Sequence, residues 1–171
     1  DEEKVSAEVR SYLQENGISL YIYNKVEEAL RNYSEYNILL DGDETSYYLW
    51  KTVKCQEIVA ATSPIPAMKA VKNATEIQGY RNAMLRDGVA MVKFLMWLKP
   101  AVEAGGQTEI SIDKKLTSLR AEQPLFRDIS FDTIAGYATH GAIVHYEATP
   151  ETDIPLKPEG LILIDSGAQY Q

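Results

Sequence analysis

The chain has 171 residues, 45% of them hydrophobic and 25% charged, a balance that argues against a disordered or collagen-like chain. Its 17 basic and 25 acidic residues give a formal net charge of -8, so we expect no nucleic-acid partner. No apolar run approaches the roughly 20 residues that cross a bilayer, and we expect no membrane association. The single cysteine, Cys55, cannot form an internal disulfide, which favours a reducing, cytoplasmic compartment.

The first third of the sequence alternates between two hydrophobic periods. Spacings of three and four predict helices, and alternating or continuous apolar runs predict strands. This alternation favours a sheet covered by helices, an α/β arrangement. The predicted helices cover residues 5–16, 26–33 and 45–53, and the predicted strands cover residues 18–23, 38–40 and 58–60.

A proline-rich segment, residues 63–66, interrupts this pattern, because each proline removes a backbone donor and restricts the residue before it. We place a domain boundary there, between residues 1–66 and 67–171. The second part begins with a long predicted helix from Asn73 to Lys99, with a capping box at its start. Its predicted buried stripe consists of Ile77, Tyr80, Met84, Gly88, Met91, Leu95 and Leu98.

A second helix is predicted from Thr108 to near Pro124. The last third predicts short strands over residues 131–135, 142–146 and 161–164, separated by glycines and prolines. The last of these is apolar on both faces, which is typical of a central strand.

Two side chains stand out as candidates for chemistry. His145 lies inside an apolar run, so it is either a satisfied core histidine or a functional one. Asp165 follows four aliphatic residues at a strand end, where its carboxylate either caps a turn through Ser166 and Gly167 or binds a hard cation. The other histidine, His140, lies in a turn-like segment and is predicted to be a solvated loop residue.

The segments around these candidates resemble a known enzyme family. Residues 141–146 (GAIVHY) and 163–170 (LIDSGAQY) closely resemble the catalytic domain of aminopeptidase P, the Xaa-Pro aminopeptidase of the pita-bread metallopeptidases. The 20-residue separation of His145 and Asp165 is similar to that of the three-domain members. Residues 63–171 carry the resemblance. Residues 1–62 contain no motif of their own but are similar in pattern and position to the end of the creatinase-like middle domain.

The resemblance implies a fold and a role for each candidate. The fold would be α/β (α+β): the C-terminal part of a creatinase-like domain over residues 1–66, then the N-terminal part of a pita-bread catalytic domain over residues 67–171. Asp165 would be the first ligand of a two-metal centre holding manganese, or alternatively zinc or cobalt. His145 would be a catalytic residue that lies beside the substrate and stabilises or protonates the tetrahedral intermediate.

The implied reaction removes the N-terminal residue from peptides with proline in second position, by attack of a dimetal-bound hydroxide. The implied partners are such a peptide and further copies of the protein in a homo-oligomer. Two alternatives remain open: a non-catalytic pita-bread module that binds proteins, and a prolidase- or creatinase-type hydrolase.

The resemblance also implies metal ligands that this sequence does not contain: a second aspartate eleven residues after Asp165, then a histidine and two glutamates. We therefore expect the sequence to be a piece of a longer protein. By itself it should neither bind metal tightly nor hydrolyse peptides, and residues 161–164 should leave a strand edge exposed.

Overall fold

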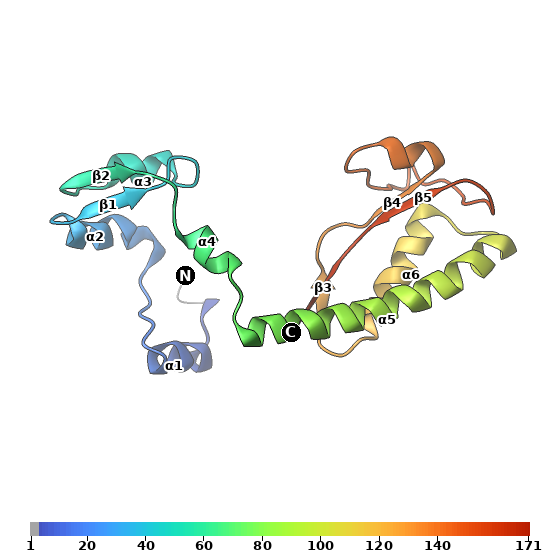
Figure 1. Ribbon diagram of the computed structural model, residues 1–171, viewed down its shortest axis with the longest axis horizontal. Coiled ribbons are helices and arrows are strands. Elements are labelled where there is room, and N and C mark those ends of the chain that lie inside the picture. Colours follow the sequence, from blue (N-terminus) through green and yellow to red (C-terminus); the bar gives the residue numbers. More distant parts are fainter. Residues whose placement is uncertain (1–3) are drawn as a thin grey trace. The chain divides into compact units, whose positions relative to one another are not determined.

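The computed structural model describes residues 4–171, which divide into two compact units between Val71 and Lys72. Both units combine helices and strands, so the predicted mixed fold class is confirmed (Figure 1). No helix among the described residues is long and apolar enough to cross a membrane.

The first unit is built around a parallel pair of strands. Strand β1 (Asn37–Leu40) pairs with β2 (Glu57–Ala60), and α3 (Tyr47–Thr52) lies in the connection between them. Three further helices belong to this unit: α1 (Ala7–Glu15), α2 (Val26–Leu30) and α4 (Ile65–Ala70). Two short 3-10 helices, η2 (Tyr23–Lys25) and η3 (Arg31–Tyr33), flank α2.

Most of the elements predicted for this unit are confirmed, and one is wrong. The predicted strand over residues 18–23 does not form; the chain runs without a strand partner to η2. Its alternating side chains remain exposed, Tyr21 at 79%, because no neighbouring strand offers an apolar face to cover them.

The second unit begins with the 31-residue helix α5 (Ala74–Ala104). The predicted capping box is confirmed: Glu76 N–H donates to Asn73 Oδ1 at 2.9 Å, and Asn73 N–H donates to Glu76 Oε2 at 2.8 Å. The predicted end at Lys99 is wrong, because the helix continues through Pro100 to Ala104. Burial of Val102 beyond the proline offsets the lost backbone bond, and the positive φ of Gly105 (86°) then ends the helix.

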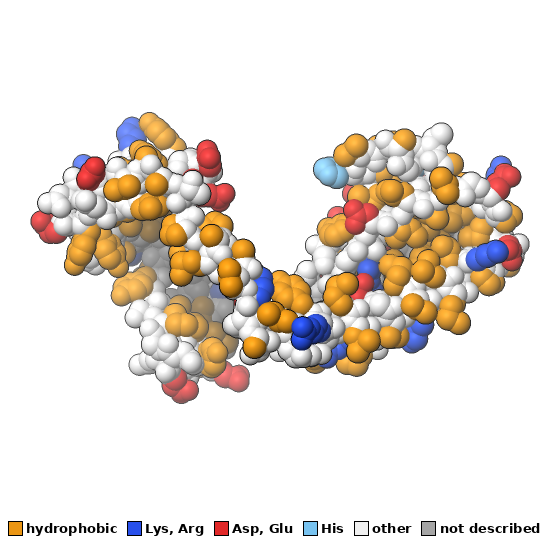
Figure 2. Space-filling model, in the orientation of Figure 1, with side chains coloured by type: hydrophobic (Ala, Val, Ile, Leu, Met, Phe, Trp, Pro, Cys, Tyr) orange, Lys and Arg blue, Asp and Glu red, His pale blue; other side chains and the backbone are white. Residues whose placement is uncertain are grey.

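The predicted buried stripe of α5 is only partly correct. Met91 and Leu98 pack against the core, but the helix buries the neighbouring face, through Ala90, Phe94 and Val102. The rest of the predicted stripe is exposed, with Met84 at 71%. Apolar residues lie both on the face of α5 that the core covers and on its exposed faces, so their spacing could not identify the covered face. Figure 2 shows hydrophobic side chains at the surface along α5. The exposed apolar residues of α5 are Ile77, Tyr80, Met84, Leu85, Val89, Val92, Leu95 and Met96.

Helix α6 (Glu109–Ala121) packs against α5 and confirms the second predicted helix. The second unit also contains two antiparallel strand pairs. The inner face of α6 and the first of these pairs complete the core. That pair joins β4 (Ile134–Tyr137) to β5 (Ile162–Asp165), and the second joins β3 (Phe126–Ile129) to β6 (Ala168–Tyr170). The buried core consists of Ala90, Phe94, Val102, Ile112, Leu116, Leu119, Ala135 and Leu156.

All three strand predictions for this unit need correction. The strand predicted over residues 131–135 overlaps β4 only at residues 134 and 135. Residues 142–146 form no strand: residue 142 ends the 3-10 helix η4 (Ala138–Ala142), and residues 143–146 follow it through a turn. Within the described part of the chain, β5 pairs with β4 alone, so it is an edge strand and not a central one. Leu161, just before it, is 85% exposed. This is the exposed edge that we expect for these 171 residues by themselves.

A buried charge network ties α5, α6 and β6 together. Arg120 is 1% exposed, and it donates from Nε to Asp87 Oδ1 at 2.8 Å and from Nη2 to Asp87 Oδ2 at 3.0 Å. The Tyr170 hydroxyl donates to Asp87 Oδ1 at 3.1 Å. No local pattern in the sequence reveals this ion pair, because Arg120 lies 33 residues from Asp87 on another helix.

This network predicts a pH dependence of stability at the alkaline end. Desolvation, together with the hydrogen bond to Asp87, raises the pKa of Tyr170 to about 12 from the ordinary 10.0. The folded state therefore holds the phenol proton more tightly than the unfolded state, so this contribution is complete below pH 10 and is lost as the pH rises toward 12. We expect the urea midpoint of the native chain to fall more steeply from pH 9.5 to 11.5 than that of Tyr170→Phe. If the urea midpoints of the native chain and of Tyr170→Phe fell by the same amount over this pH range, the prediction would be wrong.

Candidate functional site

Asp165 is the last residue of β5, opposite Ile134 of β4. Its side chain is exposed, and it forms no hydrogen bond or ion pair with the part of the chain that the structure describes. The turn-cap interpretation is therefore wrong. An exposed carboxylate with no internal partner, held at the end of a paired strand, is free to bind an external cation.

His145 lies in a turn after η4, on an exposed surface, and not on a buried strand. The interpretation as a core histidine is therefore wrong. Its backbone has a positive φ of 55°, which is unusual for a residue other than glycine and costs on the order of 1 kcal/mol. Surrounding contacts must hold the turn in this conformation, and the next residue, Tyr146, is 6% exposed.

The contacts that hold this turn converge on one buried carboxylate, Glu109, which is 0% exposed at the start of α6. Its Oε1 accepts the Tyr137 backbone N–H at 2.7 Å. Its Oε2 accepts the Tyr146 hydroxyl at 2.8 Å, and His140 Nδ1 lies 3.0 Å from both oxygens. Because a carboxylate only accepts hydrogen bonds, Nδ1 of His140 carries the hydrogen. Three donors compensate for the cost of burying this group.

Burial also affects the tyrosine of this cluster. Desolvation raises the pKa of Tyr146 above its ordinary value of 10.0. The hydrogen bond with Thr152 lowers this pKa, whereas the hydrogen bond to Glu109 and the charge of Glu109 raise it further. The His140 and Tyr146 rings lie 4.5 Å apart between centroids. Tyr146 therefore stays a hydrogen-bond donor to Glu109 across the neutral pH range.

Sequence reasoning missed this cluster. It predicts a solvated loop residue at His140, and the structure contradicts this, because the His140 ring lies 3.0 Å from the buried carboxylate of Glu109. One signal was available: two glycines, Gly136 and Gly141, flank His140. A Cβ at Gly136 would lie 2.9 Å from the backbone nitrogen of Gly141 and 2.9 Å from the carbonyl carbon of His140. This spacing indicates a close approach of backbone segments.

Both candidate residues belong to the part of the second unit that is built on β4 and β5. Asp165 ends β5, and the segment that carries His145 folds back over β4 and β5 at Gly136 and Gly141. Among the described residues, no hydrogen bond joins His145 to Asp165, and no group of three His, Cys, Asp or Glu side chains could hold a metal. Asp165 can therefore serve as one ligand, but the described residues do not build a complete metal centre.

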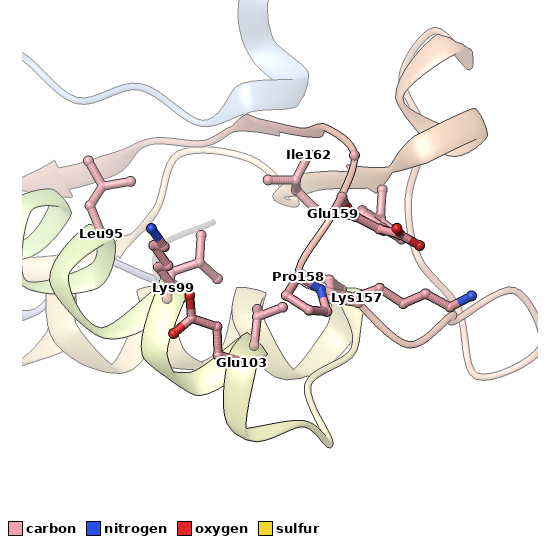
Figure 3. Close-up of a pocket in the computed structure, with 12 residues that line it drawn as sticks. Leu95, Lys99, Glu103, Lys157, Pro158, Glu159 and Ile162 are labelled. Atoms are coloured by element: carbon pink, nitrogen blue, oxygen red, sulfur yellow. The ribbon is translucent and has the colours of Figure 1, made fainter.

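An apolar cavity of about 370 Å³ lies elsewhere in the second unit. Figure 3 shows Lys99 and Glu103 of α5 on one side, and Lys157, Pro158 and Glu159 of the segment before β5 on the other. Neither candidate residue lines it. This cavity is thus separate from both candidate residues.

Comparison with known families divides the sequence into two matches. Residues 1–76 match the creatinase/prolidase N-terminal domain, and residues 78–171 match metallopeptidase family M24. The second match covers more than half of the chain and contains the Glu109 cluster, His145 and Asp165.

Individual relatives of this chain are named as aminopeptidases. The chain is 37% identical over 176 residues to Xaa-Pro aminopeptidase 1 of Dictyostelium discoideum, covering 99% of the chain and 28% of that protein. It is 28% identical over 218 residues to aminopeptidase P1 of Arabidopsis thaliana, covering 99% of the chain and 34% of that protein. The chain thus spans about a third or less of the length of these relatives.

Solved structures show the same fold. X-prolyl aminopeptidase from Caenorhabditis elegans, described as a cytosolic enzyme with a di-nuclear active site, superposes with a TM-score of 0.87 at 29% identity, over 99% of this chain and 29% of that one. Prolidase from Pyrococcus furiosus superposes with a TM-score of 0.64 at 19% identity, over 90% of this chain and 46% of that one. These likenesses confirm the fold predicted from the resemblance.

Proposed function

This chain belongs to metallopeptidase family M24, and from that membership we propose that it forms part of an Xaa-Pro aminopeptidase. Such an enzyme removes the N-terminal residue from peptides with proline in second position. The observation that carries the proposal is the 37% identity to Xaa-Pro aminopeptidase 1 of Dictyostelium discoideum over 99% of this chain. The resemblance of residues 163–170 to that family supports it further.

We propose that Asp165 is a metal ligand and that His145 is the catalytic residue at the scissile bond. Two divalent ions, manganese or alternatively zinc or cobalt, would activate a water and polarise the scissile carbonyl when bound. The remaining ligands would come from outside these 171 residues. The exposed imidazole of His145 would donate a hydrogen bond or a proton to the tetrahedral intermediate.

The organisation of the whole protein is also a proposal. Residues 1–66 would end a creatinase-like domain and residues 67–171 would begin the catalytic domain, in a cytoplasmic homo-oligomer. The exposed apolar residues of α5 and the open edge of β5 are surfaces that further protein would cover.

Three matched peptides test the proposal and separate it from its alternatives. The complete enzyme, loaded with manganese, should release the first residue of an Xaa-Pro-Xaa tripeptide about 100-fold faster than that of the Xaa-Ala-Xaa analogue, because the pocket would be shaped to the proline ring. Removal of the metal with a chelator should abolish release, and added manganese should restore it. Liquid chromatography of the products provides the measurement.

The third peptide is the dipeptide Xaa-Pro. Cleavage of this dipeptide in preference to the tripeptide would favour the prolidase-type alternative, which is also the activity named for the Pyrococcus furiosus neighbour. No cleavage of any peptide by the manganese-loaded protein would favour the non-catalytic binding module.

A further inference from the structure

One buried side chain, that of Glu109, binds both ends of the segment that carries His145, residues 137–146. Before His145, Glu109 accepts hydrogen bonds from the Tyr137 backbone and from His140. After it, the same carboxylate accepts the hydroxyl of Tyr146. Glu109 lies on α6, 28 residues before the nearest of these partners, so this attachment is tertiary and not local.

The attachment is rigid for three physical reasons. Glu109 is fully buried, so water does not compete for its hydrogen bonds. The backbone packs closely at Gly136 and Gly141, where a Cβ at Gly136 would lie 2.9 Å from the nitrogen of Gly141, so the segment lies directly against β4. The rings of His140 and Tyr146 lie 4.5 Å apart and connect the two ends of the segment to each other.

His145 itself needs such support. It is exposed and makes no hydrogen bond of its own to the described residues, and its φ of 55° lies in the left-handed region. An unsupported turn would relax toward a more common backbone conformation and carry the imidazole away. The contacts of its two flanks therefore determine where this ring lies.

We propose that Glu109 is the positioning residue for His145: it fixes the backbone on both sides of the turn and thereby presents the imidazole to the substrate. This inference rests on the catalytic role proposed for His145. Glu109 acts through Tyr137, His140 and Tyr146 and does not itself touch the substrate.

The test uses the complete, manganese-loaded enzyme with an Xaa-Pro peptide. Glu109→Ala should lower kcat about 100-fold with little change in KM, because misplacing a catalytic group by about 1 Å has an effect of this size. Tyr146→Phe removes one hydroxyl and should lower kcat about tenfold while leaving the protein folded. Tyr170→Phe is the matched control, since it removes a hydroxyl that donates to another carboxylate, Asp87, and it should leave kcat unchanged.

A double-mutant cycle separates positioning from a general structural role. If Glu109 and Tyr146 act through His145, neither substitution should lower kcat more than about threefold in a His145→Ala background. If Glu109→Ala or Tyr146→Phe lowered kcat by the same factor in the His145→Ala background as in the native enzyme, the inference would be overturned. Equal losses of kcat in Tyr146→Phe and Tyr170→Phe would also overturn it.

A readout independent of activity separates this inference from the proposed function. Amide hydrogen exchange over residues 138–145 should become about tenfold faster or more in Tyr146→Phe and should not change in Tyr170→Phe. If His145→Ala left kcat unchanged, the proposed role of His145 would fail, yet faster exchange would still support the attachment by Glu109. Unchanged exchange in Tyr146→Phe would overturn the attachment itself.

Discussion

Replacing Asp165 with alanine in the complete enzyme is expected to remove bound metal, whereas replacing His145 with alanine should leave the metal in place and lower kcat by about 100-fold or more. The two outcomes differ because a hard cation depends on the number of its oxygen ligands, while an imidazole beside the substrate acts on the transition state. Metal per chain, measured by elemental analysis of the dialysed protein, and kcat for an Xaa-Pro peptide provide the two readouts.

Glu159→Ala is the control for the Asp165 variant. It removes another exposed carboxylate from the segment that leads into β5, so it should change neither metal content nor kcat. Equal loss of metal from the Asp165 and His145 variants would show that the proposed division of roles is wrong.

Replacing Asp87 with alanine is expected to destabilise the second unit by about 3–5 kcal/mol. The reason is the residue left behind: Arg120 is 1% exposed, and its Nη1 already lacks a partner among the described residues. Without Asp87 its charge is buried and uncompensated. Domains of this size have a total stability of about 5–15 kcal/mol, so the loss is a large fraction of it.

Urea unfolding measures this loss, with Trp97 as the probe. Trp97 packs against the core of the second unit, and a Trp50→Phe background removes the other tryptophan, which lies in the first unit. The double variant Asp87→Ala/Arg120→Met should recover much of the stability, because it removes the buried charge along with its partner. A double variant less stable than Asp87→Ala would contradict this explanation.

The elements that could be predicted from the sequence are those determined by neighbouring residues. The Asn73 and Glu76 capping box and the Thr108 cap satisfy the first backbone groups of their helices, and both are visible as local patterns. The failures depend on distant partners. Residues 18–23 have the pattern of a strand but no strand to pair with, and Met84 has the spacing of a core residue but lies on an uncovered face.

The candidate site also combines features that a local pattern reveals with features that depend on distant partners. The local pattern singled out His145 and Asp165, and the family resemblance implied a role for each. Their environments were predicted wrongly, because burial depends on what packs against a segment from elsewhere in the chain. Glu109 looked like an ordinary charge in a first helical turn, where acidic residues are common. Its true partners are Tyr137, His140 and Tyr146, between 28 and 37 residues along the chain, and no local pattern reports such a contact.

The sequence separations within the Asp87 network have a consequence for the order in which the unit can assemble during synthesis. Asp87 and Arg120 are 33 residues apart, and both lie on helices that form from local contacts. Tyr170 joins them from 83 residues beyond Asp87. Since domains fold as the chain emerges, the two helices can pack together and form their ion pair while the ribosome is still adding the later strands. Tyr170 then adds its hydrogen bond to an ion pair that has already formed.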